Sequence, residues 1–170
     1  MNRLKTVTEP DTRLTEYSYD KAGNREKEIV TMDSTIIAEK TYVYNVQNRL
    51  SSVTSYVYGT GTETIDYEYD ANGNQKTSSI DEVVQVTNTY NLLNELVKTE
   101  TSETTVENVY NGEGLRVEKK VGTEVTTYLY EYQQVVMEFD SSGNMKSKNV
   151  VGINLISRTI DGQKLYYMYN

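Results

Sequence analysis

Residues 65–74 read Ile-Asp-Tyr-Glu-Tyr-Asp-Ala-Asn-Gly-Asn, and this stretch contains both signals that decide the fold. In its first half Ile65, Tyr67 and Tyr69 alternate with acidic residues, and a period of two is typical of a β-strand. In its second half Asp70 opens a turn, because an aspartate side chain accepts hydrogen bonds from backbone amides ahead of it. Gly73 supplies the positive φ that such a turn needs. The stretch therefore predicts a strand that ends in a turn directly after Tyr69.

The same stretch recurs along the chain in two versions. The first version, an aromatic residue followed by Asp-x-x-Gly-Asn, occurs at Tyr19-Asp20-Lys21-Ala22-Gly23-Asn24, at Tyr69-Asp70-Ala71-Asn72-Gly73-Asn74 and, more loosely, at Phe139-Asp140-Ser141-Ser142-Gly143-Asn144. The second version has asparagine at both turn positions and occurs at Tyr44-Asn45-Val46-Gln47-Asn48-Arg49-Leu50 and Tyr90-Asn91-Leu92-Leu93-Asn94-Glu95-Leu96. Other copies are Tyr110-Asn111, the looser Tyr130-Glu131, and Tyr169-Asn170. The Asx positions 20, 45, 70, 91 and 111 are 20 to 25 residues apart, so the chain is a tandem repeat.

A second set of turn signals lies midway between these motifs, at Met32-Asp33-Ser34, Gly59-Thr60-Gly61-Thr62, Asp81-Glu82, Ser102-Glu103 and Gly122-Thr123. Each repeat therefore contains two strands of about seven to nine residues. Alternation places Ile36, Ala38, Lys40, Tyr42 and Tyr44 on one face of a strand, and likewise Val84, Val86, Asn88 and Tyr90. We predict an all-β fold of tandem antiparallel hairpins that form one strip, with positive φ at Gly23, Gly73 and Gly143.

Composition excludes several classes of protein. Only 36% of the residues are hydrophobic, and the aromatic residues are 16 tyrosines and one phenylalanine. Any core is therefore partly hydrated, because each phenol hydroxyl needs water or a hydrogen-bond partner. A net charge of −8 argues against nucleic acid as a partner. No apolar run is long enough to span a membrane. The absence of cysteine suits an exported protein, and we expect any export signal to lie outside this chain.

Tyr-Asp-x-x-Gly-Asn with a period near 20 resembles the YD repeats of RHS proteins, and the resemblance covers essentially the whole chain. We expect YD-repeat hairpins over residues 1–109 and the start of an RHS-associated core over 110–170, continuous with the same sheet. In that family the hairpins spiral into a hollow β-shell that encloses a C-terminal toxin, and related repeats form the barrel of the teneurins. The resemblance implies a scaffold that is secreted or lies at the cell surface or wall of a bacterium. It does not imply catalysis. The Asp-Pro autocleavage motif of family cores is missing, since Pro10 is the only proline and follows Glu9.

The residues offer little chemistry beyond this. Nucleophilic catalysis of the Ser-His or Cys-His type is excluded, because the chain has no histidine and no cysteine. Paired carboxylates for glycoside hydrolysis are a disfavoured alternative to solvated strand faces. A calcium loop at Asp70, Asn72, Asn74 and Asp81 has Gln75 where glycine is required, so we predict no metal, no cofactor and no enzymatic activity.

The tyrosines leave two functions open. Rows such as Tyr42-Tyr44 and Tyr67-Tyr69 are interpreted as cross-strand packing in a structural wall segment of a toxin-enclosing shell. The alternative is a carbohydrate-binding or adhesion module that stacks sugar rings on exposed tyrosines. The expected partners are neighbouring repeats of the parent chain and an encapsulated toxin. An isolated strip of hairpins has open edges and uncovered faces, so we also expect it to form a homo-oligomer.

Overall fold

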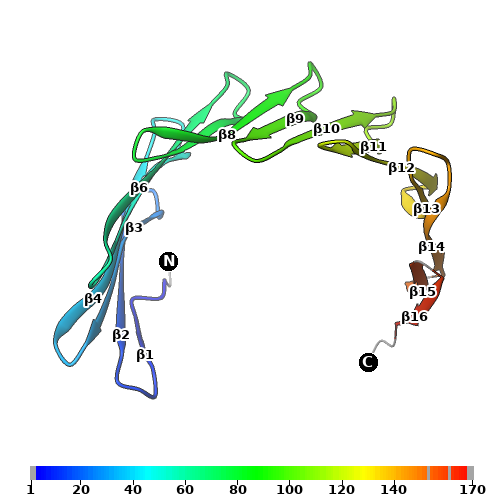
Figure 1. The fold of residues 1–170 in the computed structure, drawn as a ribbon. Helices are drawn as coiled ribbons and strands as arrows, with labels where there is room; N and C mark the ends of the chain where they lie inside the picture. The colour runs from blue at the N-terminus through cyan, green and yellow to red at the C-terminus, as the bar shows by residue number, and fades with distance from the viewer. Residues whose placement is uncertain (1–2, 153, 161, 168–170) are drawn as a thin grey trace. The chain divides into compact units, whose positions relative to one another are not determined.

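The computed structural model describes residues 3–152, 154–160 and 162–167, and within them it contains strands and turns but no helix (Figure 1). In these residues, therefore, no helix is long and apolar enough to cross a membrane. The chain divides into two compact units, Met1–Thr87 and Asn88–Asn170. The predicted repeat copy at Tyr169-Asn170 lies outside the described residues.

The strands follow one another without interruption in both units. The first unit contains β1 (Thr6–Thr8), β2 (Leu14–Tyr19), β3 (Arg25–Met32), β4 (Thr35–Tyr44), β5 (Leu50–Val57), β6 (Gly61–Tyr69), β7 (Gln75–Ile80) and most of β8 (Val83–Tyr90). The second contains β9 (Leu96–Thr101), β10 (Thr105–Tyr110), β11 (Arg116–Val121), β12 (Glu124–Glu131), β13 (Gln134–Phe139), β14 (Met145–Val151), β15 (Leu155–Ile160) and β16 (Gln163–Tyr166). Within each unit, strands that are consecutive in the sequence pair antiparallel. The all-β fold of tandem hairpins is confirmed.

Consecutive strands run in opposite directions, so their turns alternate between the two sides on which the strand ends meet. We call these two sides the edges of the sheet. In each unit we call the edge formed by turns after even-numbered strands the tyrosine edge, and the other the far edge. The tyrosine edge holds turns 20–24, 45–49 and 70–74 in the first unit, and 91–95, 111–115 and 132–133 in the second. The far edge holds turns 33–34, 58–60 and 81–82 in the first unit, and 102–104, 122–123 and 140–144 in the second.

A β-bulge follows the aromatic residue at the end of a strand. Tyr44 pairs with Leu50 whereas Val43 pairs with Ser52, so Ser51 is an extra residue in β5. The same shift of register occurs at Tyr19, Tyr69, Tyr110, Tyr130 and Phe139. An extra residue bends the strand and increases its twist, so the bulges bend these repeats at the same position.

Two further bulges overturn part of the predicted alternation. Val30 pairs with Ala38 and Thr31 with Ile36. Directly paired residues share a face and neighbours alternate, so Ile36 lies on the opposite face from Ala38. The prediction that Val84 and Val86 share a face was wrong for the same reason, since their partners are the adjacent residues Ser79 and Ser78. Period-two counting fails wherever one strand has an extra residue.

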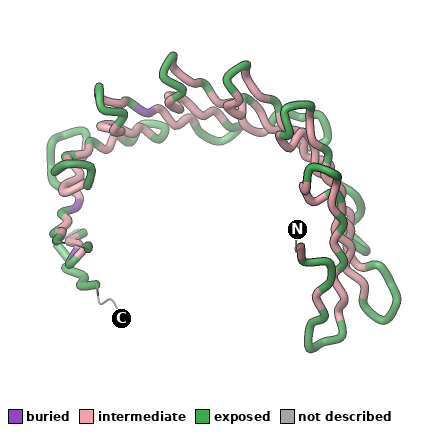
Figure 2. Tube along the Cα trace, turned by 180° about the vertical axis from the view of Figure 1, so that it is seen from behind, coloured by how far each residue is buried: buried purple, intermediate pink, exposed green. Residues whose placement is uncertain are grey.

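The structure has no hydrophobic core in the part of the chain that it describes. None of the apolar side chains there is fully buried, and the buried residues are the polar Asn108, Ser147 and Ser157. Most strand residues are half-buried, whereas the turns are largely exposed (Figure 2). Cohesion between hairpins must therefore come from the backbone ladder and from specific contacts between neighbouring repeats.

Candidate functional site: the tyrosine edge

The aspartate turns are held by the aspartate side chain. Asp20 Oδ1 accepts hydrogen bonds from the backbone amides of Gly23 (2.6 Å) and Asn24 (2.8 Å), and its Oδ2 accepts one from Asn24 Nδ2 (2.9 Å). The Gly23 amide also donates to the Asp20 carbonyl (3.1 Å). Asp70 makes the same bonds to the backbone and side chain of Asn74, at 2.8 and 2.9 Å. The glycines of these turns have φ of +101° at Gly23 and +96° at Gly73, as predicted.

Hydrogen bonds from Asn24 and Asn74 hold the pKa of Asp20 and of Asp70 below the ordinary carboxyl value of 3.8. Burial works against this shift, and bonds from backbone amides add to it. Both carboxyls are therefore ionised at neutral pH, as an acceptor of three donors requires. Their folded-state pKa is depressed, so their contribution to stability is complete above the ordinary value and disappears as the pH falls through the folded one.

The asparagine turns form the same loop with a neutral cap. Asn45 Oδ1 accepts hydrogen bonds from the backbone amides of Gln47 and Arg49, both at 3.0 Å. Asn48 takes the positive φ of 64° that glycine takes in the other version. The remaining copies have the same cap. Asn91 Oδ1 accepts hydrogen bonds from the amides of Leu93 and Glu95, and Asn94 has a φ of 63°. Asn111 Oδ1 accepts them from the amides of Glu113 and Leu115. Two sequence versions thus produce one backbone shape.

When each repeat is counted from the aromatic residue before its Asx turn, tyrosine hydroxyls connect each repeat to the one before it. Tyr44 donates to the carbonyl of Arg25 (3.0 Å), and Tyr69 donates to the carbonyl of Leu50 (2.7 Å). The equivalent bonds run from Tyr19 to Leu4 (2.8 Å), from Tyr110 to Leu96 (3.1 Å) and from Tyr130 to Arg116 (2.9 Å). Burial raises the pKa of Tyr44, so its phenol keeps the proton that it donates. Tyr90 stands at the equivalent position, at the end of β8.

The accepting carbonyl lies in a fixed place relative to the ladder. Pairing of β5 with β6 begins at Ser52, two residues after Leu50. Pairing of β3 with β4 begins at Lys27, two residues after Arg25, and the offset is the same for Leu4, Leu96 and Arg116. The tyrosine therefore reaches a carbonyl just beyond the end of the backbone ladder, at a residue that the next strand no longer pairs with. A buried carbonyl without a partner is costly, so these hydrogen bonds extend the cohesion of the sheet to its edge.

Arginines from the asparagine turns cover the glycines of the aspartate turns. The Arg49 guanidinium lies 5.7 Å from the centre of the Tyr69 ring, and a β-carbon added to Gly73 would be 2.5 Å from its Nη2. Arg3 has the same place over Tyr19 and Gly23. Glycine is required here for its positive φ, and its lack of a β-carbon also lets the guanidinium lie directly over the turn. The sequence indicated the positive φ but not the arginine.

Neighbouring turns of the first unit also contact each other directly. Asn24 Nδ2 donates to Asn48 Oδ1, and Asn48 Nδ2 donates back to Asn24 Oδ1 at 3.3 Å. The pair joins the last residue of an aspartate turn to the left-handed residue of the following asparagine turn. The two turn versions are therefore complementary in side-chain chemistry as well as alternating along the first unit.

The turn at Asp140 is a correction to the predicted repeat. Its local geometry is that of the other aspartate turns, with Gly143 at φ +81° and Asp140 bonded to Asn144. However, it connects β13 to β14 and so lies on the far edge, not the tyrosine edge. Phe139 has no hydroxyl, so this turn cannot make the bond that closes the other repeats. The turn motif alone was a misleading signal, because Asp-x-x-Gly-Asn folds the same way at either edge.

In the second unit an asparagine makes the equivalent bond in a repeat that has no tyrosine there. Asn149 Nδ2 donates to the carbonyl of Val135 at 2.8 Å. Val135 lies two residues before Met137, where the ladder of β13 and β14 begins, so it is the equivalent acceptor. Asn108 makes a similar bond to Leu96 at 2.9 Å, beside that of Tyr110. No sequence signal indicated Asn149, because the residues around it in the sequence do not match the repeat motif.

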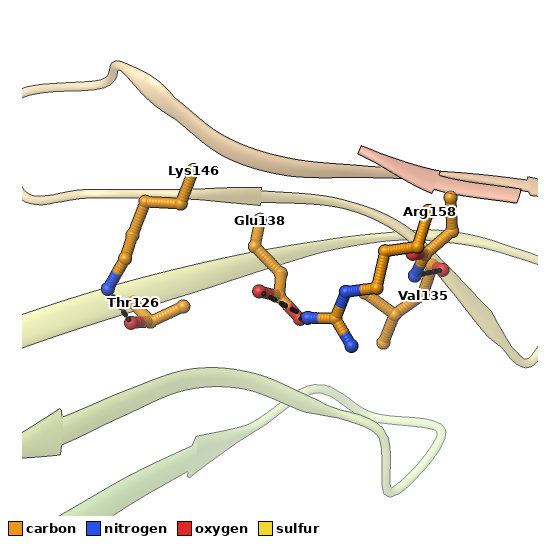
Figure 3. Close-up of polar contacts among 6 residues, drawn as sticks. Thr126, Val135, Glu138, Lys146 and Arg158 are labelled. Atoms are coloured by element: carbon orange, nitrogen blue, oxygen red, sulfur yellow. Dashed lines mark hydrogen bonds and ion pairs between the residues drawn. The ribbon is translucent and has the colours of Figure 1, made fainter. Parts of the chain in front are cut away.

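Longer side chains in the same region reach past the neighbouring strand to the strand after it. Arg158 on β15 passes β14 and donates to both carboxylate oxygens of Glu138 on β13, at 3.1 and 3.2 Å (Figure 3). Lys146 on β14 reaches Thr126 on β12 at 3.2 Å. Second neighbours in a sheet are about 10 Å apart, within reach of a long side chain leaning along the surface. These contacts tie together repeats that share few apolar contacts.

The calcium alternative is excluded by the positions of its residues. Asp70 and Asp81 lie at opposite ends of the six-residue strand β7, a separation of about 20 Å. Asp81 accepts a hydrogen bond from the Thr64 amide (3.0 Å) in a far-edge turn. The residues that the structure describes contain no group of three or more acidic side chains that could hold a metal ion.

An open groove lies between two successive turns of the tyrosine edge in the first unit. It has a volume of about 550 Å³ and is lined by Arg49, Tyr67, Tyr69 and Asp70, among others. A smaller groove at Asp20, Tyr42 and Tyr44 is its equivalent one repeat earlier. Aromatic rings beside ionic and amide groups can bind polar ligands, although the tyrosine hydroxyls are already used between repeats.

Comparison with known proteins agrees with this architecture. The RHS repeat family model matches residues 2–33. The tRNA3(Ser)-specific nuclease WapA of Bacillus spizizenii is 28% identical over 174 residues, and the match covers all of this chain but only 7% of that protein. The crystal structure of TcdB2-TccC3-TEV superposes with a TM-score of 0.55 at 14% identity, over 98% of this chain and 12% of that one. The Tc holotoxin pore of Photorhabdus luminescens gives 0.52 at 14% identity, over 93% and 11%.

The two structural matches show a shared fold. The structure shows what the repeated residues do at successive turns. Tyrosine, Asx and a left-handed glycine or asparagine occupy equivalent positions from one hairpin to the next, and an equivalent carbonyl accepts the bond each time. The chain is therefore a tandem array of one hairpin repeat, and its residues 2–33 match the RHS repeat family.

Proposed function

We propose that this chain is a structural, non-catalytic wall segment of a bacterial RHS/YD protein whose shell encloses or presents a toxin. The observation that carries the proposal is the recurring hydroxyl-to-carbonyl bond, which joins each hairpin to the previous one. A repeated contact of this kind builds a continuous surface from units that have no core of their own. The division into YD hairpins over 1–109 and the start of an RHS-associated core over 110–170 is part of the proposal.

The names of the similar proteins support a toxin context. One is a nuclease and another is a holotoxin pore, and this chain corresponds to a small part of each. A wall segment needs no active site of its own, since the toxic activity would belong to another part of the parent protein. We place that protein outside the cell or at the cell surface.

Limited proteolysis of the parent protein tests the proposal. Replacing Tyr44 and Tyr69 together by phenylalanine removes two inter-repeat bonds and leaves the rings in place. If these repeats form the wall of an enclosure, the double variant exposes the enclosed segment to protease faster than the wild type does. The matched control is Tyr58→Phe, in a far-edge turn with the side chain 66% exposed. Equal rates of cleavage in all three proteins would contradict the enclosing role.

The tyrosine-edge groove favours a second candidate, a carbohydrate-binding module. The groove places two tyrosine rings beside Arg49 and Asp70, a combination that suits the apolar faces and hydroxyl groups of a sugar. Calorimetric titration with cell-wall polysaccharides decides between the two functions. Saturable binding that Tyr67→Ala abolishes would support the module, and its absence would leave the structural role.

Self-association is a further part of the proposal. Leu92 is fully exposed and Leu93 is 73% exposed in one turn, and the faces of both units carry half-buried apolar residues. Such surface is ordinarily covered in a stable protein. We propose that neighbouring repeats of the parent protein cover it, and that the chain on its own forms homo-oligomers.

A further inference from the structure

Three turns of the chain share one backbone and one cap, but they differ in what lies above their glycine. Arg49 covers Gly73 and Arg3 covers Gly23, each against the aromatic ring that precedes the turn. Among the residues that the structure describes, a β-carbon added to Gly143 would meet nothing within 4 Å. We call the turn glycine and the aromatic ring before the turn the platform. The third turn therefore has the same platform without the guanidinium.

The empty platform has a complete supporting structure. The Asp140 amide donates to the carbonyl of Asn144 (2.9 Å), and the Gly143 amide donates to the carbonyl of Asp140 (3.0 Å). Asp140 Oδ1 accepts hydrogen bonds from the amides of Ser142 (2.9 Å) and Asn144 (2.8 Å). Phe139 provides the aromatic ring in the position of Tyr19 and Tyr69. The platform is therefore formed whether or not an arginine covers it.

The register of the sheet explains why no arginine of this chain covers it. Continuing the pairing of β5 with β6 places Arg49 opposite Tyr69, and that of β1 with β2 places Arg3 opposite Tyr19. The residue opposite Phe139 is Thr127. A threonine side chain is too short to reach over Gly143, so the position that provides the guanidinium elsewhere provides none here.

The arginines of this chain are all engaged elsewhere. Arg3 and Arg49 cover the other two turns, and Arg116 lies over the ring of Tyr128. The other three form ion pairs, Arg13 with Glu9 and Asp11, Arg25 with Glu28, and Arg158 with Glu138. A second copy of the chain has the same arginines in the same contacts. The occupant therefore comes from a different polypeptide.

We propose that the turn Phe139–Asn144 is a docking site for an arginine side chain of a partner polypeptide, with the guanidinium over Gly143 and against the Phe139 ring. Arginine suits the site better than lysine, because a planar guanidinium stacks on an aromatic ring and on a flat peptide, whereas an ammonium group is a compact, strongly hydrated charge. The charge of the platform is favourable, since Asp140 is ionised and the chain carries a net charge of −8. The site lies on the far edge, away from the contacts that join the repeats, so it goes beyond the proposed wall function.

N-acetyl-arginine amide is the probe, and N-acetyl-citrulline amide, which has the same shape without the charge, is the control. In NMR titrations of the whole chain, we expect the arginine compound to shift the Gly143 and Phe139 resonances saturably, with a dissociation constant of about 1 mM or weaker, the range of a single small contact. The citrulline compound is expected to shift them at least five times less. Equal shifts from the two compounds would overturn the proposal.

Two variants make the test independent of probe affinity. Thr127→Arg places a guanidinium opposite Phe139, as Arg49 is placed opposite Tyr69, so it is expected to fill the platform from within and abolish the shifts caused by the probe. Thr127→Gln is the control of similar length without charge, and it should leave the titration unchanged. If Thr127→Arg also leaves the titration unchanged, the platform does not accept arginine and the proposal is wrong.

Discussion

Removal of one phenolic hydroxyl measures what the inter-repeat bond contributes. Tyr69→Phe deletes the donor to the Leu50 carbonyl, a bond of 2.7 Å between half-buried groups, and leaves the ring in place. An intramolecular hydrogen bond contributes about 0.5–1.5 kcal/mol net, and a carbonyl left without a partner away from water costs more. Water can reach the edge of this sheet in part. We therefore expect the free energy of unfolding to fall by about 1 kcal/mol.

Urea denaturation followed by circular dichroism is the assay. A loss of hydrogen bonding without a change in the surface exposed on unfolding lowers the midpoint and leaves the slope unchanged. The bonds of Tyr19, Tyr44 and Tyr69 have different acceptors in successive repeats, so the three phenylalanine variants should lower stability additively within about 0.5 kcal/mol. Hydrogen exchange should show that protection is lost first on both sides of the altered repeat.

The control is Tyr58→Phe, because Tyr58 is 66% exposed in a far-edge turn of the same unit. This change removes a hydroxyl from the same residue type without touching an inter-repeat contact, so its effect on the midpoint should be negligible. The reasoning is refuted if Tyr69→Phe and Tyr58→Phe have the same midpoint. That result would mean that the backbone ladder alone holds neighbouring hairpins together.

Four other experiments test the rest of the structure. Gly73→Val should cost about 1–2 kcal/mol in thermal unfolding, since a β-branched residue is strained at positive φ; an unchanged melting temperature would contradict the turn geometry. Glu107→Gln should be nearly silent in the same measurement, because its 2.9 Å ion pair with Lys120 is half exposed. Stability should be constant from pH 7 down to about pH 5 and then fall below the ordinary carboxyl value of 3.8, less steeply in Asp70→Asn, because the pKa of Asp70 is lowered in the folded state. Sedimentation at about 100 µM should show association of the isolated chain, which a strictly monomeric particle would disprove.

The strands and turns could be predicted because their causes are local. An Asx side chain caps the amides ahead of it and a glycine or asparagine takes the left-handed conformation, whatever surrounds the turn. Alternating threonine, valine and tyrosine indicate a strand in the same way. The local nature of these signals also explains the error at Phe139-Asp140, where a correct turn prediction was assigned to the wrong edge. Only the number of strands between two turns determines the edge, and single-residue bulges do not affect that number.

The role of the tyrosines could not be predicted, because it depends on register. Period-two counting placed Tyr67 and Tyr69 on one face, but nothing in the motif states that the Tyr69 hydroxyl reaches the Leu50 carbonyl, 19 residues earlier. That contact requires the bulge after Tyr44, which sets where the ladder of β5 and β6 begins. The placement of Arg49 over Gly73 could not be predicted from the sequence for the same reason. Sequence reasoning considered the two residues separately, and only the pairing of β5 with β6 brings them together.

The bond made by Asn149 shows what the repeat needs at its edge. Tyr130 and Asn149 differ in size and aromaticity, yet each donates to a carbonyl two residues before the ladder begins, at Arg116 and Val135. The shared property is a donor that projects past the last backbone pair. In a sheet without a buried apolar core, each repeat must satisfy this carbonyl with a side chain, because neither a neighbouring strand nor a second layer does so. Tyrosine meets the need most often because its rigid ring places the hydroxyl at a fixed reach and also covers the half-buried surface of the previous repeat. The recurrent tyrosine is thus a consequence of the open sheet, and asparagine is sufficient where the donor residue directly follows the last backbone pair, as Asn108 and Asn149 do.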